Sequence, residues 1–255
     1  MLKKLKNYKF MFEELVSRDF KQKYKRTTLG MLWSILSPLL TLFIMRIVFV
    51  NFFGRGIEHY TTYLFCGNLI FSYYRESSTG GMNSLVSNAS IITKINAPKY
   101  LFLLSKNVAS LINFGLTLII FFIFCIFDGV TFGWNFFMLI FPIVCLVVFN
   151  VGIGMVLSAL YVFFKDIAYL FDIFNMLLMY CSAIFYQIDT YSETVQRIFL
   201  INPVYCYIHY FRVIVLDGRI PSIQYHALCV FYAAVMLLIG MFIYKKYNQR
   251  FLYYL

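Results

Sequence analysis

Residues 18–40 read RDFKQKYKRTTLGMLWSILSPLL, and in this stretch a strongly basic segment runs directly into an apolar one. The basic residues are Arg18, Lys21, Lys23, Lys25 and Arg26. The apolar part continues to Phe53, and its roughly 24 residues at about 1.5 Å each exceed a hydrocarbon core of about 30 Å. Because Lys and Arg beside a spanning helix hold that end in the cytoplasm, this junction predicts the orientation of the whole chain.

The composition indicates that the bilayer is the solvent of this protein. Of its 255 residues, 62% are hydrophobic and only 13% are charged, which a soluble domain of this size does not show. The net charge of +11 comes from basic residues that cluster beside apolar runs. Such clusters suit an anionic membrane surface, so we expect membrane lipids as partners and no nucleic acid.

Hydropathy predicts an all-α polytopic membrane protein with six transmembrane helices. The predicted spans cover about 30–53, 60–87, 100–127, 134–164, 167–186 and 223–244. Residues 187–222, between the fifth and sixth spans, carry two apolar patches that are too short to cross a membrane. They predict an external re-entrant hairpin, packed against protein or a wet cavity.

Ahead of the transmembrane domain, residues 29–255, the sequence predicts a separate amphipathic and basic segment over residues 1–28. Apolar side chains recur there at spacings of three and four over residues 5–16, which predicts a helix with one apolar face. That face ends near Val16, because Asp19 and Lys23 would interrupt it. A helix of this kind lies in the membrane interface or packs on a partner protein.

The distribution of charge gives an independent test of this topology. The predicted outer side holds only Arg55, Arg197, Arg212 and Arg219, and most other Lys and Arg residues fall on the inner side. Six helices with both termini in the cytoplasm therefore satisfy the positive-inside rule.

The inner half of the second span is polar, reading RESSTGGMNS from Arg75 to Ser84. Polar side chains at that depth must face protein or water, so this half predicts the lining of a cavity or a helix interface. By rise per residue, Arg46 and Glu76 could pair, which would leave Arg75 to meet a substrate phosphate. Alternatively, Arg46 extends to the outer surface while Arg75 and Glu76 form structural pairs.

Aromatic residues make up 21% of the chain. Tyr rings stack on sugar faces while their hydroxyls form hydrogen bonds, which would suit the passage of a glycan, but aromatic residues also pack cores and mark membrane interfaces. The candidates for a sugar-stacking role are Tyr73, Tyr74, Phe185 and Tyr186.

The sequence carries no pattern of a catalytic or metal site. Its three histidines, His59, His209 and His226, stand far apart, and there is no GxxxxGK[ST] loop for a nucleotide. The six cysteines stand singly, which predicts small apolar fillers rather than disulfides or ligands. If the protein is a pump, its ATPase must be a separate subunit.

Several short motifs, in order along nearly the whole chain, carry a family resemblance. They are Lys23-Tyr24-Lys25-Arg26-Thr27, Leu29-Gly30, Leu32-Trp33, Pro38-Leu39, Gly80 to Asn88 with Ile95 and Pro98, Phe164-Lys165-Asp166-Ile167, Ser182 to Tyr186, and Asn202-Pro203 with Phe211-Arg212. This order resembles the permeases of type-2 ABC exporters, and most closely the branch that moves lipid-linked polysaccharides of O-antigen, capsule or teichoic acid. The chain departs from that pattern at Ala183 and Gln187, where such permeases often have Pro.

The resemblance implies a bacterial cytoplasmic (inner) membrane protein in which two copies of the chain pair with two nucleotide-binding ATPase subunits. ATP and Mg would bind to those subunits, and no cofactor would bind to this chain. The substrate would be an undecaprenyl-linked polysaccharide that enters beside the N-terminal segment.

The resemblance also implies roles for individual residues. Segments that couple to the ATPase would include Asn88, Ile91, Lys94, Ile95, Pro98, Lys165 and Asp166. A translocation path or gate would include Tyr73, Tyr74, Arg75, Glu76, Phe185, Tyr186, Asn202, Pro203, Phe211 and Arg212. The substrate entrance would include Arg18, Lys21, Lys25 and Arg26.

Two other functions remain open from the sequence. One is a type-2 ABC permease for drugs or small lipids. The other is a membrane-embedded enzyme acting on lipid-linked sugars, for which Asp189, Glu193 and Asp217 offer carboxylates.

Overall fold

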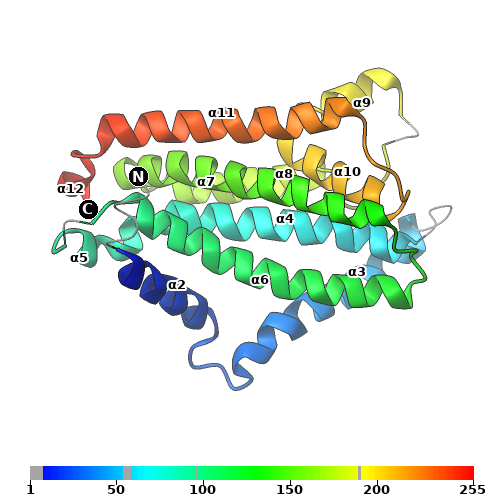
Figure 1. The fold of residues 1–255 in the computed structure, drawn as a ribbon, viewed down its shortest axis with the longest axis horizontal. Helices are drawn as coiled ribbons and strands as arrows, with labels where there is room; N and C mark the ends of the chain where they lie inside the picture. Colours follow the sequence, from blue (N-terminus) through cyan, green and yellow to red (C-terminus); the bar gives the residue numbers. More distant parts are fainter. Residues whose placement is uncertain (1–7, 54–58, 96, 189–190) are drawn as a thin grey trace.

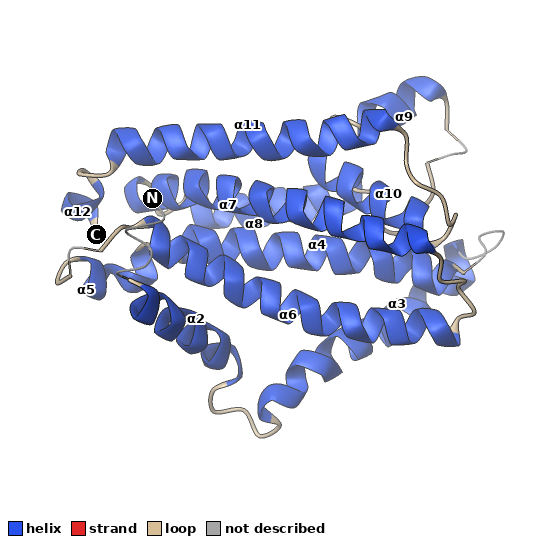
Figure 2. Ribbon diagram, in the orientation of Figure 1, coloured by secondary structure: helices blue, strands red, loops and turns tan. Residues whose placement is uncertain are grey.

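The computed structural model describes residues 8–53, 59–95, 97–188 and 191–255, and the described chain is helical with no β-strand (Figure 2). The long helices are α2 (Lys9–Tyr24), α3 (Trp33–Phe53), α4 (Tyr60–Asn83), α6 (Tyr100–Phe127), α7 (Ile140–Phe163), α8 (Ile167–Cys181), α10 (Pro203–Val215) and α11 (Ile223–Tyr247). Shorter helices are α5 (Ala89–Ile92), α9 (Glu193–Phe199) and α12 (Phe251–Tyr254), with 3-10 turns at Gly30–Leu32, Val86–Asn88 and Trp134–Leu139.

The helices lie side by side along the long axis of the molecule, with α2, α5 and α12 at one end and α9 at the other (Figure 1). Four segments among the described residues are long and apolar enough to cross a membrane: Gly30–Phe49, Tyr100–Phe127, Trp134–Phe163 and Ile223–Tyr247. The bent pair α9 and α10 gives a fifth if it is counted as one span. This arrangement confirms a polytopic all-α protein.

Glycine residues bring α7 into very close contact with α11 and α4. A Cβ added at Gly152 would lie 2.5 Å from the backbone of Met236 and Leu237 in α11, and one added at Gly81 in α4 would lie 2.9 Å from the Cα of Gly154. Small residues permit this approach, which is how helices associate in lipid, where no hydrophobic force drives them together. The glycines therefore make α4, α7 and α11 the rigid centre of the fold.

One helix departs from the others in composition. In α4, the side turned to its neighbours is fully buried, whereas the residues that remain accessible are Thr61, Asn68, Ser72, Arg75, Glu76, Thr79, Gly80 and Asn83. None of them carries a large apolar side chain, and from Asn68 on they recur at three to four residues, so they lie on one side of the helix. We call Asn68, Ser72, Arg75, Glu76, Thr79 and Asn83 the polar face of α4.

The N-terminal helix extends further than the sequence predicted. Helix α2 continues to Tyr24, whereas the predicted amphipathic helix ended near Val16. Residues 5–7 of that predicted helix lie outside the described residues. Asp19 does not interrupt the packing, because its buried carboxylate accepts hydrogen bonds from Lys106 Nζ at 3.0 Å and Ser105 Oγ at 2.9 Å in α6. A charged residue on the inner face is tolerated because it is paired there.

A turn over residues 25–32 joins α2 to α3 and stands away from the rest of the bundle (Figure 1). We call this turn the elbow. Arg26 and Gly30 both have a left-handed backbone, with φ of 65° and 54°, which lets the chain reverse within a few residues. Leu29, Met31 and Leu32 on the elbow are exposed apolar side chains.

Several predicted spans differ from the helices at their ends. The second predicted span, 60–87, is helical to Asn83, and the fifth, 167–186, ends as a helix at Cys181. The fourth, 134–164, begins as the 3-10 turn Trp134–Leu139, and the sixth continues to Tyr247 rather than 244. The two patches in 187–222 are two short helices, α9 and α10, that meet at an angle of 108°.

We predict that Gly152→Ala destabilises the protein by about 1–3 kcal/mol, because the methyl group must push α7 and α11 apart. Gly115→Ala is the matched control, since nothing lies within 4 Å of its Cβ position and Ala favours a helix. The measurement is unfolding of the purified protein in mixed micelles at rising SDS fraction. Equal midpoints for the two variants would contradict the close packing.

Candidate functional site

Three open cavities adjoin one another, and the polar face of α4 lines two of them. The first, of about 380 Å³, lies between the elbow, α3, α4 and α6, and we call it the neutral cavity. The second, of about 720 Å³, lies beside α2, and we call it the basic cavity. The third, of about 500 Å³, shares Ser72 and Glu76 with the neutral cavity and Ser87 and Lys106 with the basic one. We call it the connecting cavity.

The basic cavity collects three of the four predicted entrance residues. Its lining residues are Arg18, Lys21, Gln22, Lys25, Ser87 and Lys106. Arg26, the fourth, is exposed on the elbow. Buried Asp19 lies between Arg18 Nη2 at 2.8 Å and Lys106 Nζ at 3.0 Å, so one carboxylate offsets only part of the positive charge. The remaining cations favour an anionic ligand.

Glu76 pairs with Lys23 and not with Arg46, the partner that its expected depth in the membrane suggested. Its Oε2 forms an ion pair with Lys23 Nζ at 2.8 Å, and its Oε1 accepts a hydrogen bond from Asn113 Nδ2 at 2.7 Å. The possible pairing of Glu76 with Arg46 is therefore wrong, and Arg46 is exposed on α3. Counting residues along a helix gave the expected depth of Arg46 and Glu76 in the membrane. The way the chain folds between α2 and α3 determines that Lys23, and not Arg46, contacts Glu76.

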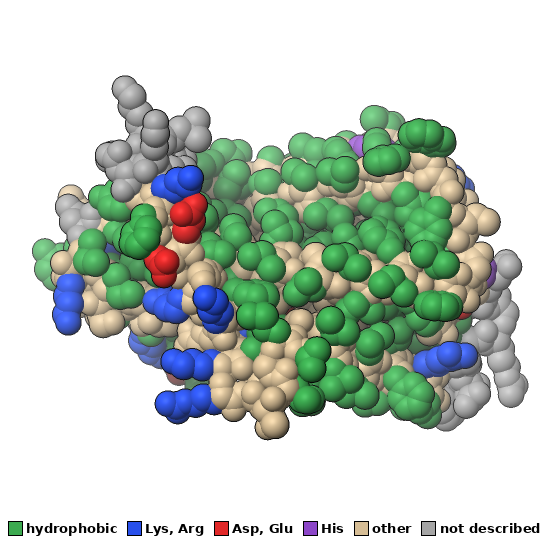
Figure 3. Space-filling model, turned by 60° about the horizontal axis from the view of Figure 1, so that its bottom comes forward, with side chains coloured by type: hydrophobic (Ala, Val, Ile, Leu, Met, Phe, Trp, Pro, Cys, Tyr) green, Lys and Arg blue, Asp and Glu red, His purple; other side chains and the backbone are tan. Residues whose placement is uncertain are grey.

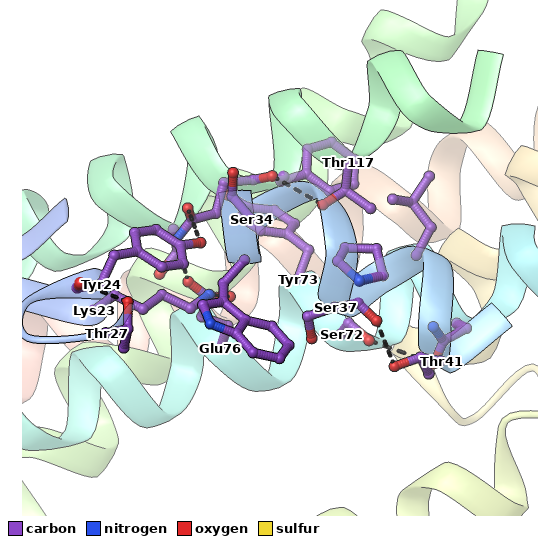
Figure 4. A pocket seen from close by; sticks show the side chains of 17 residues that line it. Lys23, Tyr24, Thr27, Ser34, Ser37, Thr41, Ser72, Tyr73, Glu76 and Thr117 are labelled. Carbon is purple, nitrogen blue, oxygen red and sulfur yellow. Dashed lines mark hydrogen bonds and ion pairs between the residues drawn. The ribbon is translucent and has the colours of Figure 1, made fainter. Parts of the chain in front are cut away.

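The same network fixes the end of α2. Tyr24 donates from its hydroxyl to Asn113 Oδ1 at 3.0 Å, and burial raises the pKa of this phenol, which keeps its proton in place for that bond. Lys23 and Tyr24 thus hold the end of α2 against α4 and α6 (Figure 4). Lys23 was one of the basic residues in the opening stretch, but no sequence pattern distinguished it from its neighbours.

Arg75, next to Glu76, points into the connecting cavity and is exposed. Among the described residues its side chain has no hydrogen bond or ion pair. By contrast, Tyr73 and Tyr74 are 3% and 1% exposed, so in the single chain they pack inside the bundle. Tyr73 also borders the neutral cavity, against Phe114 at 4.5 Å between ring centroids.

The predicted gate residues of the fifth span and the hairpin meet in one corner, where α8 ends and α10 begins. Arg212 of α10 is 6% exposed and donates to the carbonyl oxygens of Ala183 at 2.8 Å, Ile184 at 2.9 Å and Tyr63 at 3.1 Å. Its guanidinium carbon lies 3.4 Å from the centre of the Tyr63 ring. Two of the bonds go to carbonyl groups just beyond the end of α8, which have no helical partner, and the third goes to Tyr63 in α4.

Asn202 supports the same corner from the start of α10. Its side chain accepts from the backbone N–H groups of Val204 and Tyr205 as a helix cap, and donates to the Cys181 carbonyl at 3.1 Å. Pro203 occupies the first turn of α10, where a missing N–H costs nothing. The other predicted residues of this corner pack within it: Phe185 is buried, Tyr186 is half-buried, and Phe211 is fully buried.

The predicted coupling segments lie at the end of the molecule that carries α5 and α12 (Figure 1). Lys94, Ile95, Lys165 and Asp166 are exposed there, and Ile91 and Pro98 are half-buried. Asn88 is buried and accepts a hydrogen bond from Arg18 Nη2 at 2.7 Å, so it joins the segment to α2. Lys99 bonds to Asn248, and burial lowers its pKa.

The described residues contain no group of three His, Cys, Asp or Glu that could hold a metal ion. All six cysteines are free, and five are buried, as expected of apolar fillers, while Cys181 is exposed.

Comparisons with known proteins agree along most of the chain. A family model described as ABC-2 type transporter matches residues 11–216. Two O-antigen export system permease proteins RfbA of Klebsiella pneumoniae are 28% and 29% identical to it, over 96% and 98% of both chains. A protein of the same name from Myxococcus xanthus is 23% identical over 88% of this chain and 87% of its own.

We predict that Arg212→Ala lowers the free energy of unfolding by about 2–4 kcal/mol, because the buried carbonyl groups of Ala183, Ile184 and Tyr63 lose the bonds that its guanidinium donates. Arg212→Lys should recover only part of this loss, since one ammonium group cannot reach all three carbonyls. Arg219→Ala is the control, because the side chain of Arg219 is exposed and pairs with exposed Asp217. SDS unfolding midpoints measure the effect, and an unchanged midpoint for Arg212→Ala would refute it.

Proposed function

The chain belongs to the ABC-2 type transporter family, and from this premise we propose that it is the permease subunit of an exporter for a lipid-linked polysaccharide of the O-antigen type. The carrying observation is the similarity to O-antigen export permeases over nearly the full length of both chains. The ATPase is a separate subunit, present in two copies, which binds ATP and Mg. No nucleotide-binding loop occurs in this sequence.

The proposed membrane arrangement uses six spanning helices, α3, α4, α6, α7, α8 and α11, in the bacterial cytoplasmic membrane. Basic side chains gather at the end that carries α2, α5 and α12, and apolar side chains cover the middle (Figure 3). Because positive residues favour the inner side, this supports cytoplasmic termini. The bent pair α9 and α10 is then a re-entrant hairpin in the outer leaflet.

Two of these six helices do not meet the requirements of a membrane span in the single chain. Helix α4 is too polar to face lipid, and α8 has 15 residues, which rise only about 22 Å. We propose that a second copy of the chain and a water-filled path between the copies cover the polar face of α4. The exposed apolar side of α8, which includes Tyr169, Ile173 and Met176, is suited to a helix of the second copy.

The polar face of α4 is the proposed path, and the basic cavity is the proposed entrance. The diphosphate of an undecaprenyl-linked glycan would meet Arg18, Lys21 and Lys25, whose charges are only partly offset by Asp19. Further along, Arg75 offers an unpaired guanidinium in the connecting cavity. A guanidinium binds phosphate through two parallel hydrogen bonds, which suits the same ligand.

Coupling to the ATPase is proposed for the segments at the basic end, α5 to Pro98 and Lys165-Asp166. Both are short connections that start from a helix of the rigid centre, the first leading from α4 to α6 and the second from α7 to α8. ATP-driven closure of two ATPase subunits would move these turns and bias the permease between two packings.

We predict that Arg75→Glu reduces surface polysaccharide more than tenfold in a deletion strain that expresses the variant, because the path then repels phosphate. Arg75→Lys should retain part of the export, since the charge remains. Arg197→Glu on α9 is the matched control, because its exposed side chain borders none of the three cavities. Gel analysis of the surface polysaccharide measures the result, and full export by Arg75→Glu would overturn this role.

We also predict that Ile95→Glu prevents the ATPase subunit from co-purifying with the tagged permease, because it places a carboxylate in an apolar contact. Tyr253→Glu, at the same end and 87% exposed, should leave co-purification intact. The amount of each variant in the membrane is measured in parallel. Normal recovery of the ATPase with Ile95→Glu would exclude this segment as the contact.

A further inference from the structure

Most hydroxyl groups that line the neutral cavity face it as hydrogen-bond acceptors rather than donors. Seven of its lining residues are Ser or Thr: Thr27, Ser34, Ser37, Thr41, Ser72, Ser110 and Thr117. Five of these hydroxyls donate to a backbone carbonyl three or four residues earlier, at 2.7 to 3.0 Å. A hydroxyl that has used its proton still has lone pairs to accept with. A ligand that bonds to these five oxygens must therefore bring donors of its own.

The two charged groups of the cavity cancel each other. Among the described residues, Lys23 and Glu76 are the only charged ones that line it, and they form an ion pair at 2.8 Å. Asn113 is occupied as well, because it accepts from Tyr24 and donates to Glu76. A phosphate has no strong attraction to a site of zero net charge whose hydroxyl groups mostly accept. The lining therefore discriminates against the anionic part of any ligand.

Flat apolar surfaces complete the lining. Tyr24, Trp33, Tyr73 and Phe114 contribute aromatic rings from α2, α3, α4 and α6. A small-molecule site typically combines apolar and aromatic walls with a few placed polar groups. In Figure 4 the rings of Tyr24 and Tyr73 lie among the Ser and Thr side chains that line this cavity of about 380 Å³.

We propose that the neutral cavity binds a neutral sugar ring. Sugar hydroxyls supply donors to the accepting oxygens, and the C–H face of the ring packs on an aromatic surface. The cavity lies next to the elbow, whose apolar side chains are exposed, so the sugar can be bound while a lipid carrier stays in the membrane. This proposal rests on the exporter function, because it assigns the site of one sugar unit of the exported glycan.

The sequence offers a specific optical probe of this cavity. The protein has two tryptophans, Trp33 in the lining and Trp134, which is 87% exposed at the start of the fourth span. In the full-length Trp134→Phe variant in lipid vesicles, Trp33 is the only tryptophan, and selective excitation of tryptophan makes it the reporter. We expect its emission to change saturably on titration with methyl mannoside, methyl galactoside, methyl rhamnoside or N-acetylglucosamine, for at least one of them.

Two variants make the test specific. Thr117→Val on the same background keeps the shape of the side chain and removes an accepting oxygen, so it should weaken sugar binding about fivefold. Trp33→Phe, which retains only Trp134, should give no saturable signal. Absence of a signal with every sugar, or a sugar signal that Thr117→Val leaves unchanged, would overturn the proposal.

Two further probes separate the alternatives. A saturable signal with inorganic phosphate or with glycerophosphoethanolamine, but with no sugar, would identify an anion or lipid-headgroup site and overturn the proposal. Export is measured separately in the deletion strain. Export without sugar binding would refute this inference and leave the exporter function standing, whereas sugar binding by a chain that supports no export would refute the exporter function alone.

Discussion

The fold depends on a constraint set by α4, whose accessible side is polar at a depth where lipid tails would otherwise surround it. A lone helix of this kind has no stable place in a bilayer. The chain meets the constraint on one side, where α2 supplies Lys23 and α6 supplies Asn113 as partners for Glu76. The rest of the face, with Arg75, is left open, and this opening is where the proposed path and second copy belong.

An open polar face requires the opposite side of α4 to be held firmly. The glycine contacts do this, because Gly81 meets Gly154 of α7 and Gly152 brings α7 onto α11. Such packing leaves α3 and α8 at the margins, where most of their residues are exposed. The rigid centre therefore holds the polar face of α4 in place. The exposed helices α3 and α8 can shift to pack against a second copy of the chain. Arg212 has a related role, because it holds the broken end of α8 on α10 and α4.

Local hydropathy predicted the elements well where apolarity alone sets them, as in α6, which covers the expected 100–127. It failed where a distant side chain ends a helix. Ile184 and Phe185 are as apolar as a spanning segment, yet α8 stops at Cys181, because Ala183 turns to a φ of 50° and Arg212, far along the chain, binds the freed carbonyls. The partner of Glu76 was missed for a similar reason. The depth of Glu76 in the membrane does not show that α2 folds back and brings Lys23 next to α4. The polar face of α4 was predictable, because polar side chains at the depth of the lipid tails must face protein or water.

The Lys23–Glu76 pair also separates two kinds of site along α4. If Lys23 were unpaired, the neutral cavity would attract the same phosphates as the basic cavity, since charges act strongly where water is scarce. Pairing confines that attraction to the α2 side. From Ser87 to Ser72 the chain covers about 22 Å at helical rise, so a phosphate and a sugar of one extended ligand could occupy the two ends together. Such a ligand has one favourable orientation, with its anionic part at α2 and its hydroxyl groups toward α3, and the polar face thereby gives the proposed path a direction.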